Sequence, residues 1–131
     1  MKEKLILVIE DDDSTRFYIR KTLELEGYNV RTLEDGGDAI ENIRQEIPDL
    51  VITDIIMENK GGFEVIRDIK KEFSEIKIIA VSGGGIIDKK DVLKSAEKLG
   101  ADASLSKPFK VEQLLETVKN VFGILGSPSQ T

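Results

Sequence analysis

Acidic side chains stand at the ends of two short apolar segments, where a parallel sheet would bring them together. Glu10 and Asp11 come directly after the apolar run Leu5–Ile9, and Asp54 follows the run Leu50–Thr53. Carboxylates that converge repel one another unless a hard divalent cation draws their oxygens together. We therefore expect Glu10, Asp11 and Asp54 to form a Mg²⁺ site.

Two further polar side chains come after the last two strand-like segments. Ser82 follows Ile76–Val81, and Lys107 comes after the weaker run Ala103–Leu105. Taken alone, either side chain is more typical of a solvated loop. Beside the acids, however, a hydroxyl and an ammonium supply partners for phosphoryl oxygens, so the set predicts phosphoryl transfer to a carboxylate.

Asp12 and Asp13 have a more ordinary interpretation than the two acids before them. A carboxylate directly before a helix accepts free backbone N–H groups and favours the positive end of the helix dipole. We therefore expect one of these two residues to cap a helix. Glu10 and Asp11 precede that cap and stand where the strand opens into the crevice.

The composition excludes most other kinds of active site. The chain has 131 residues, which suits one domain, and it contains neither cysteine nor histidine. Thiolate nucleophiles, Ser-His-Asp triads and ordinary zinc sites are therefore excluded. The formal net charge of -6 disfavours nucleic acid and anionic membranes as partners. The opening apolar run is too short for a secretory core or a membrane span, so we expect a cytoplasmic protein.

Strand-like and helical segments alternate along the chain. The strand-like runs already named are joined by Asn29–Leu33, and helical periodicity separates them. The expected inward-facing helical residues are Ile19 and Leu23; Ala39, Ile40 and Ile43; Phe63, Ile66 and Ile69; Val92, Ala96 and Leu99; and Val111, Leu114, Leu115, Val118, Val121 and Phe122. This alternation predicts a doubly wound α/β fold around a parallel sheet, with the functional crevice at the carboxyl ends of the strands.

These motifs together resemble the receiver domain of two-component response regulators, of the single-domain type found in chemotaxis regulators. The likeness is carried by LILVIEDDDSTR, PDLVITDIIM, GGFEVIRDIK, IIAVSGGG and GADASLSKPF, which occur in that order. The resemblance implies a flavodoxin-like (βα)5 three-layer fold with strand order 2-1-3-4-5. We expect residues 4–122 to form this domain and residues 123–131 to be a flexible tail or the stub of a linker.

The resemblance also assigns roles to the polar residues. It implies that Asp54 accepts a phosphoryl group from a phosphohistidine of a sensor histidine kinase or phosphotransfer protein. Ser82 would be the switch hydroxyl and Lys107 the residue that senses the phosphate, after a cis peptide bond to Pro108. The acidic pair, Asp54 and the backbone carbonyl of Ile56 would bind Mg²⁺.

Phosphorylation would then shift the loop Gly83–Gly85 and the helix after it. The resemblance implies that a downstream protein, or a second copy of the chain, binds the surface of the fourth helix, fifth strand and fifth helix. Such a domain is not an ordinary enzyme, but it assists its own phosphorylation and dephosphorylation. Three positions depart from the common pattern: Ser104 replaces an aromatic switch residue, Glu58 a proline and Glu10 an aspartate.

Three alternatives remain open at this point. Asp11-Asp12-Asp13 after an apolar strand also fits a haloacid-dehalogenase-like phosphatase, in which Asp11 would be the nucleophile. Residues 82–85 could cradle the phosphate of a flavin or nucleotide in a flavodoxin-like binding module. The chain could also be an inactive pseudo-receiver that serves only for docking.

Overall fold

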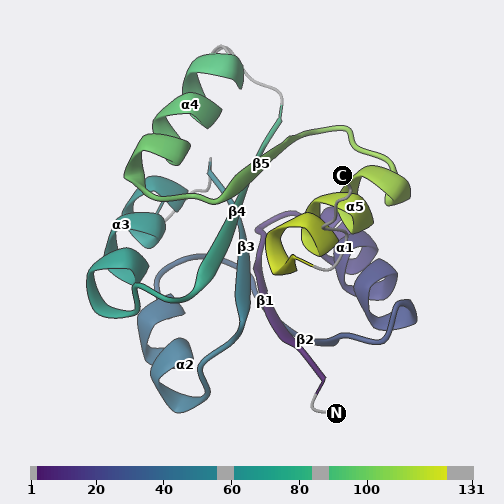
Figure 1. Cartoon of the computed structure of the whole chain (residues 1–131), viewed down its shortest axis with the longest axis horizontal. Coiled ribbons are helices and arrows are strands. Elements are labelled where there is room, and N and C mark those ends of the chain that lie inside the picture. Colours follow the sequence, from purple (N-terminus) through teal and green to yellow (C-terminus); the bar gives the residue numbers. More distant parts are fainter. Residues whose placement is uncertain (1–2, 56–60, 84–88, 124–131) are drawn as a thin grey trace.

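The computed structural model describes residues 3–55, 61–83 and 89–123. Its elements alternate in chain order: β1 (Leu5–Ile9), α1 (Asp13–Leu25), β2 (Asn29–Leu33), α2 (Ala39–Gln45), β3 (Leu50–Asp54), α3 (Gly62–Glu72), β4 (Lys77–Ser82), α4 (Lys89–Leu99), β5 (Ala103–Ser106) and α5 (Val111–Phe122). The predicted alternation of strands and helices is therefore confirmed (Figure 1).

The five strands form one parallel sheet in the order β2-β1-β3-β4-β5. Each pairing is in continuous register; Ile6, for example, lies opposite Leu50, and Leu50 lies opposite Lys77. Strands β1 and β3 are central and almost wholly buried, which explains their unbroken apolar runs. The predicted fold class and strand order are both confirmed.

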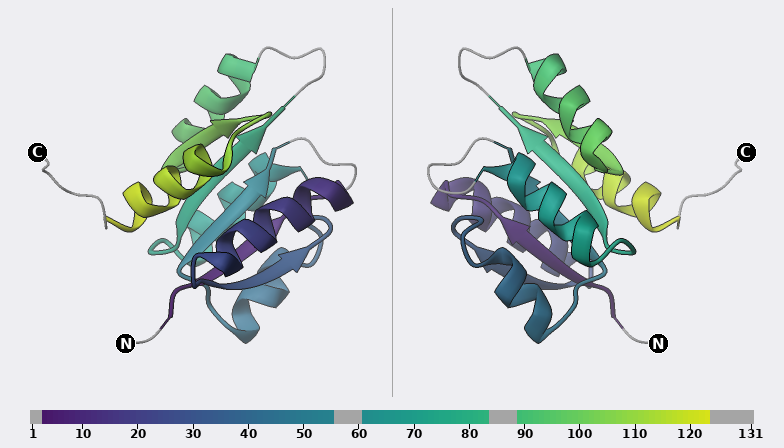
Figure 2. Two further views of the ribbon diagram at one scale, coloured as in Figure 1. Left: turned by 90° about the vertical axis from the view of Figure 1, so that its right-hand side faces the viewer. Right: turned by 90° about the vertical axis from the view of Figure 1, so that its left-hand side faces the viewer.

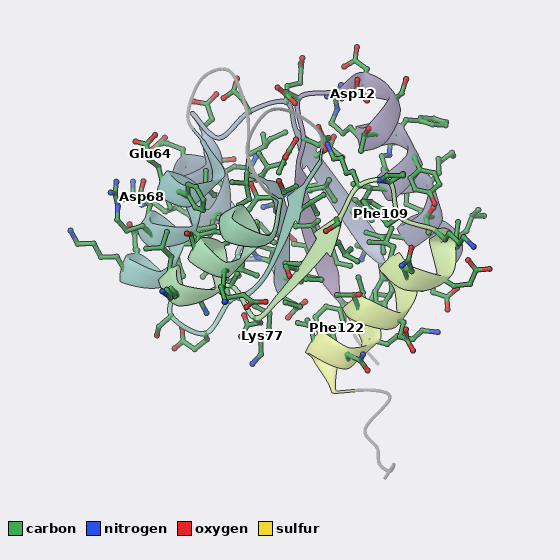
Figure 3. All side chains as sticks on the ribbon, turned by 90° about the horizontal axis from the view of Figure 1, so that it is seen from above. Asp12, Glu64, Asp68, Lys77, Phe109 and Phe122 are labelled. Atoms are coloured by element: carbon green, nitrogen blue, oxygen red, sulfur yellow. The ribbon has the colours of Figure 1, made fainter. Side chains whose placement is uncertain are left out.

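Helices cover both faces of the sheet and divide the core into two (Figure 2). On one face, α2, α3 and α4 pack on the sheet through buried residues such as Ile43, Ile66 and Ala96. On the other face, α1 and α5 pack through Ile19 and Leu114, among others. In Figure 3, Phe109 and Phe122 lie on the α5 side of the molecule, and Glu64 and Asp68 lie on the α3 side.

The turns from helix to strand depend on glycine in two places. Gly27 follows α1 and Gly100 follows α4, with φ angles of +99° and +124°. Residues with a side chain rarely adopt these backbone angles, so glycine lets the chain leave each helix and return directly to the sheet. None of the helices within the described part of the chain is long and apolar enough to cross a membrane.

Several predicted boundaries and faces need correction. β3 extends to Asp54, which lies opposite Val81 of β4, and β4 extends to Ser82, which lies opposite Ser106 of β5. Leu99 and Val111 were expected to face the core, but both are 40% exposed because they lie at the ends of their helices. The side chain of Val92 lies outside the described residues.

Candidate functional site

The candidate site lies at the carboxyl edge of the sheet, where four strands end near one another. Glu10 follows β1, Asp54 ends β3, Ser82 ends β4 and Lys107 follows β5. The pairings of β1 with β3, β3 with β4 and β4 with β5 bring these ends to one edge. The topology of the sheet therefore places four of the predicted residues on one side of the molecule.

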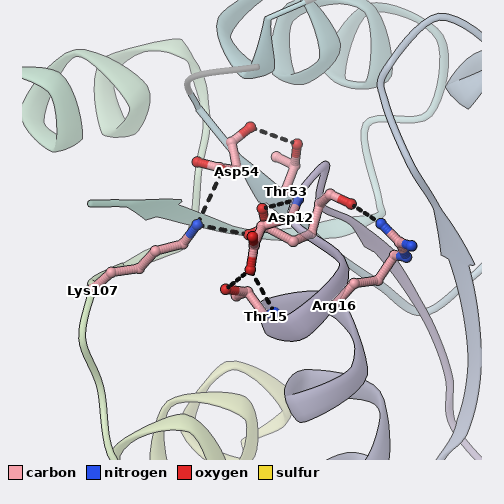
Figure 4. A network of polar contacts seen from close by, with 7 residues as sticks. Asp12, Thr15, Arg16, Thr53, Asp54 and Lys107 are labelled. Atoms are coloured by element: carbon pink, nitrogen blue, oxygen red, sulfur yellow. Dashed lines mark hydrogen bonds and ion pairs between the residues drawn. The ribbon is translucent and has the colours of Figure 1, made fainter. Parts of the chain in front are cut away.

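An ammonium group stands between two buried carboxylates at this edge. Nζ of Lys107 donates a hydrogen bond to Oδ2 of Asp54 at 3.1 Å and lies 2.8 Å from Oε1 of Glu10 (Figure 4). Glu10 is 1% exposed and Asp54 is 5% exposed. Burial of two acids near each other is costly, and Lys107 offsets part of that cost.

Glu10 carries the largest electrostatic perturbation at the site. Burial raises the pKa of its carboxyl group to about 7, with a smaller upward contribution from the charge of Asp54, while contacts with Lys107 and the Asp12 amide lower it. Burial of the Lys107 ammonium lowers its pKa, but the nearby Glu10 and Asp54 outweigh burial, so the net pKa is raised. Each group thus favours the proton more than it would in water.

The three acids are arranged so that they could hold a divalent ion. Glu10, Asp11 and Asp54 each offer one carboxylate oxygen within 4.8 Å of the others. Oε2 of Glu10 accepts the amide of Asp12 at 3.0 Å. Oε1 is buried and lies 2.8 Å from Nζ of Lys107. Carboxylate oxygens are the hard ligands that Mg²⁺ prefers, so the residues present fit the expected ion.

The first turn of α1 fixes the loop that carries the acidic pair. Asp12 is the N-cap, and its carboxylate accepts the backbone amide of Thr15 at 2.8 Å and the Thr15 hydroxyl at 2.7 Å. Both bonds lower the pKa of Asp12, and the bond from the Thr15 hydroxyl has the larger effect. The cap was expected at Asp12 or Asp13, and the structure places it at Asp12, with Asp13 the first residue of the helix.

The remaining expected residues lie around the Lys107 loop. Ser82 is buried, and its backbone carbonyl accepts the amide of Lys107 at 2.7 Å. The Lys107–Pro108 peptide bond is cis, as the resemblance implied. The expected metal ligand Ile56, the substituted position Glu58 and the glycines at 84 and 85 lie outside the described residues.

Sequence reasoning missed three residues that shape the site. Arg16 donates to the backbone carbonyl of Glu10 at 2.8 Å, and the Thr53 hydroxyl donates to the carbonyl of Asp54 at 3.0 Å (Figure 4). A Cβ atom on Gly62 would lie 2.3 Å from that same carbonyl of Asp54, so α3 can start this close to β3 only with glycine. All three residues contact backbone carbonyl groups, and the positions of these groups cannot be read from residue types in the sequence.

Comparison with known proteins decides the family. The family model "Response regulator receiver domain" matches residues 6–119, most of the chain. The chain belongs to this family. This receiver domain is 32% identical over 114 residues to the response regulator MprA of Mycolicibacterium vanbaalenii, a match that covers 87% of the chain. It spans 48% of that relative, about half of its length.

Solved structures of other receiver proteins have the same fold. The receiver domain of NtrX from Brucella abortus is 29% identical, with a TM-score of 0.83 over 93% of this chain and 99% of that one. The chemotaxis protein CheY4 of Vibrio cholerae is 27% identical, with a TM-score of 0.81 over 92% of this chain and 99% of that one. These comparisons favour neither a phosphatase nor a flavin-binding module.

Proposed function

We propose that the receiver domain accepts a phosphoryl group on Asp54 from a phosphohistidine of a sensor histidine kinase or phosphotransfer protein. The observation that carries the proposal is the Asp54 carboxylate itself, buried at the end of β3 and 3.1 Å from the Lys107 ammonium. Membership of the family supports the same chemistry. Residues 1–131 contain no histidine, so the donor has to come from elsewhere.

In the proposed reaction, a carboxylate oxygen of Asp54 attacks phosphorus and a P–O bond forms. The P–N bond to the donor imidazole breaks, and its electron pair returns to the ring. Lys107 keeps its positive charge at the site and pairs with an oxygen of the acyl phosphate. The protein contributes positioning and neutralisation of charge, the two effects on which phosphoryl transfer chiefly depends.

We further propose that Asp11, Asp54 and Glu10 hold Mg²⁺. The support is the approach of their carboxylate oxygens to within 4.8 Å and the buried Oε1 of Glu10. When bound, the ion would neutralise negative charge on the phosphoryl oxygens. The backbone carbonyl of Ile56 is the fourth ligand that the family resemblance implies.

The output of the switch is also proposed from the family. The Ser82 hydroxyl bonds the phosphoryl group and draws the loop 83–85 inward, which shifts α4 and the surface formed by α4, β5 and α5. That surface then binds a downstream protein or a second copy of the domain.

We also propose that residues 4–122 form the domain and that residues 123–131 are a tail or linker. We propose further that the protein is cytoplasmic and that the domain assists its own dephosphorylation.

Incubation with acetyl phosphate, a small donor, tests the phosphoacceptor role without a partner kinase. With Mg²⁺, the intact mass of the protein should rise by one phosphoryl group, whereas chelation of the metal should abolish the change. Asp54→Asn should remain unmodified under both conditions. A wild-type mass that does not change with Mg²⁺ would indicate an inactive docking module instead.

A further inference from the structure

We propose that Arg16 is a positioning residue that holds the corner between β1 and α1 in the shape required for binding a divalent cation. The inference rests on the proposed function, because it concerns the same Mg²⁺ site. Arg16 lies on α1, and the residues that it would position come before that helix.

One guanidinium group contacts both ends of the acidic run. Nη1 of Arg16 donates to the backbone carbonyl of Glu10 at 2.8 Å, and Nη2 donates to the carboxylate of Asp13. These two acceptors flank Asp11 and Asp12 in the sequence, so the side chain spans the corner from one side to the other. The Arg16 side chain is only 18% exposed, which limits the competition of water for its bond to the Glu10 carbonyl, whereas the Asp13 carboxylate is 86% exposed.

The corner contains a second set of bonds, and together they leave Asp11 facing the other acids. The amide of Asp12 donates to the Glu10 carboxylate, and the Asp12 carboxylate caps α1 by accepting the amide of Thr15. Within the part of the chain that the structure describes, the Asp11 carboxylate has no hydrogen bond or ion pair. Its position therefore depends on the backbone of the corner, to which Arg16 is bonded directly.

The forked geometry of arginine explains why this residue type suits the role. A guanidinium presents several donors in a fixed plane and can bond a carbonyl and a carboxylate at once, whereas a lysine ammonium is a single point charge. Changes in groups that orient metal ligands typically weaken metal binding by about 10- to 100-fold. Arg16→Gln should therefore weaken Mg²⁺ binding by about 10-fold, and Arg16→Lys should recover only part of the loss.

Arg20 supplies a matched control on the same helix. It has the same charge and pairs with Glu24 at 3.2 Å, and its side chain is 50% exposed. We would measure the Mg²⁺ dissociation constant of each folded variant by calorimetry, and amide hydrogen exchange at Asp12 in metal-free protein. Arg16→Gln should weaken binding and accelerate exchange, whereas Arg20→Gln should change either quantity less than about 2-fold.

The outcomes separate this inference from the proposed function. If Arg16→Gln and Arg16→Lys both bind Mg²⁺ as Arg20→Gln does, the positioning role is wrong. If Arg16→Gln does not fold, Arg16→Lys decides between the two results. If the wild-type protein binds Mg²⁺ but takes no phosphoryl group from acetyl phosphate, the proposed function fails while the effect of Arg16 on metal binding still stands. If saturating Mg²⁺ restores the phosphorylation of Arg16→Gln, the result would support both the positioning role of Arg16 and the proposed function.

Discussion

The two ends of the sheet use charged side chains in different ways. At the amino ends of the strands, acids accept backbone N–H groups: Asp49 bonds the amide of Leu5 and Asp102 bonds the amide of Ile78, each at 2.8 Å. Lys70 lies 3.7 Å from Asp102 as well. These carboxylates fix the places where strands begin, and they are partly exposed to water.

At the carboxyl ends, the carboxylates of Glu10 and Asp54 contact Lys107, and the carboxylate of Asp11 lies near those two acids. Glu10 and Asp54 are buried there, and the pKa of Glu10 is raised. A raised acid pKa means that the folded protein disfavours the ionised form, so ionised Glu10 costs stability at this end of the sheet. Burial of Glu10 and Asp54 at the carboxyl end therefore reduces stability, as expected for a binding site for a cation and a phosphoryl group.

The largest expected effect concerns the pH dependence of Glu10. A folded pKa of about 7, against an ordinary value of 4.5, means that the folded state binds the proton more tightly than the unfolded state. Stability in metal-free buffer should therefore fall as pH rises from about 4.5 through about 7, by up to about 3 kcal/mol from this group. Glu10→Gln should remove that fall.

Urea unfolding with a metal chelator present gives the free energy of unfolding at pH 5 and at pH 8. The quantity of interest is the wild-type change between the two pH values minus that of the variant, because other groups titrate in both proteins. Equal changes in the two proteins would mean that Glu10 is not held in an unfavourable ionised state.

A smaller effect is expected at the lysines of the two ends. Lys107→Met removes the ammonium between Glu10 and Asp54, and should cost about 2 kcal/mol of metal-free stability because buried acids lose their counter-charge. Proton uptake by Glu10 limits the loss. Lys70→Met, its counterpart at the amino end, should cost less than about 1 kcal/mol because its ion pair is partly exposed.

Unfolding of both lysine variants at pH 8 in the same buffer provides the comparison. We expect Lys107→Met to be the less stable of the two variants. A larger loss from Lys70→Met would show that the amino end, rather than the carboxyl end, is where charge burial matters most.

The smallest effect on stability is expected from Asp11, whose carboxylate is exposed. Asp11→Ala should raise metal-free stability slightly, since it relieves repulsion from Glu10 and Asp54. Its effect on metal binding should be much greater: added Mg²⁺ should raise the melting temperature of the wild-type protein but not that of the variant. Equal stabilisation of both proteins by Mg²⁺ would place the ion elsewhere.

The fold could be predicted from the sequence because its central strands are recognisable as continuous apolar runs. Runs such as Leu5–Ile9 are apolar throughout, as strands buried on both faces must be, and helical periodicity between them leaves a parallel sheet as the simplest arrangement. The ends of elements were less predictable. Leu99 and Val111 have apolar side chains in helical register, yet each lies at a helix terminus where the core no longer covers it.

The convergence of Glu10, Asp11 and Asp54 could be predicted from the sequence, because acidic side chains follow two strands that end at the same edge of a parallel sheet. Contacts with the backbone could not be predicted in this way. Arg16 and Thr53 contact carbonyl oxygens, whose positions are fixed only once strands and helices have packed. No residue pattern in the chain distinguishes such an arginine or threonine from one that lies on an ordinary helix or strand.

Identification of the modified side chain tests whether Asp54 is the phosphoacceptor. After reaction with acetyl phosphate and Mg²⁺, borohydride reduction converts an acyl phosphate into a stable alcohol at the residue that carried it. Proteolysis and mass spectrometry then locate that residue. We expect a single modified position, Asp54, on the peptide that contains strand β3. Modification at Asp11 instead would contradict the account and indicate the chemistry of a phosphatase nucleophile.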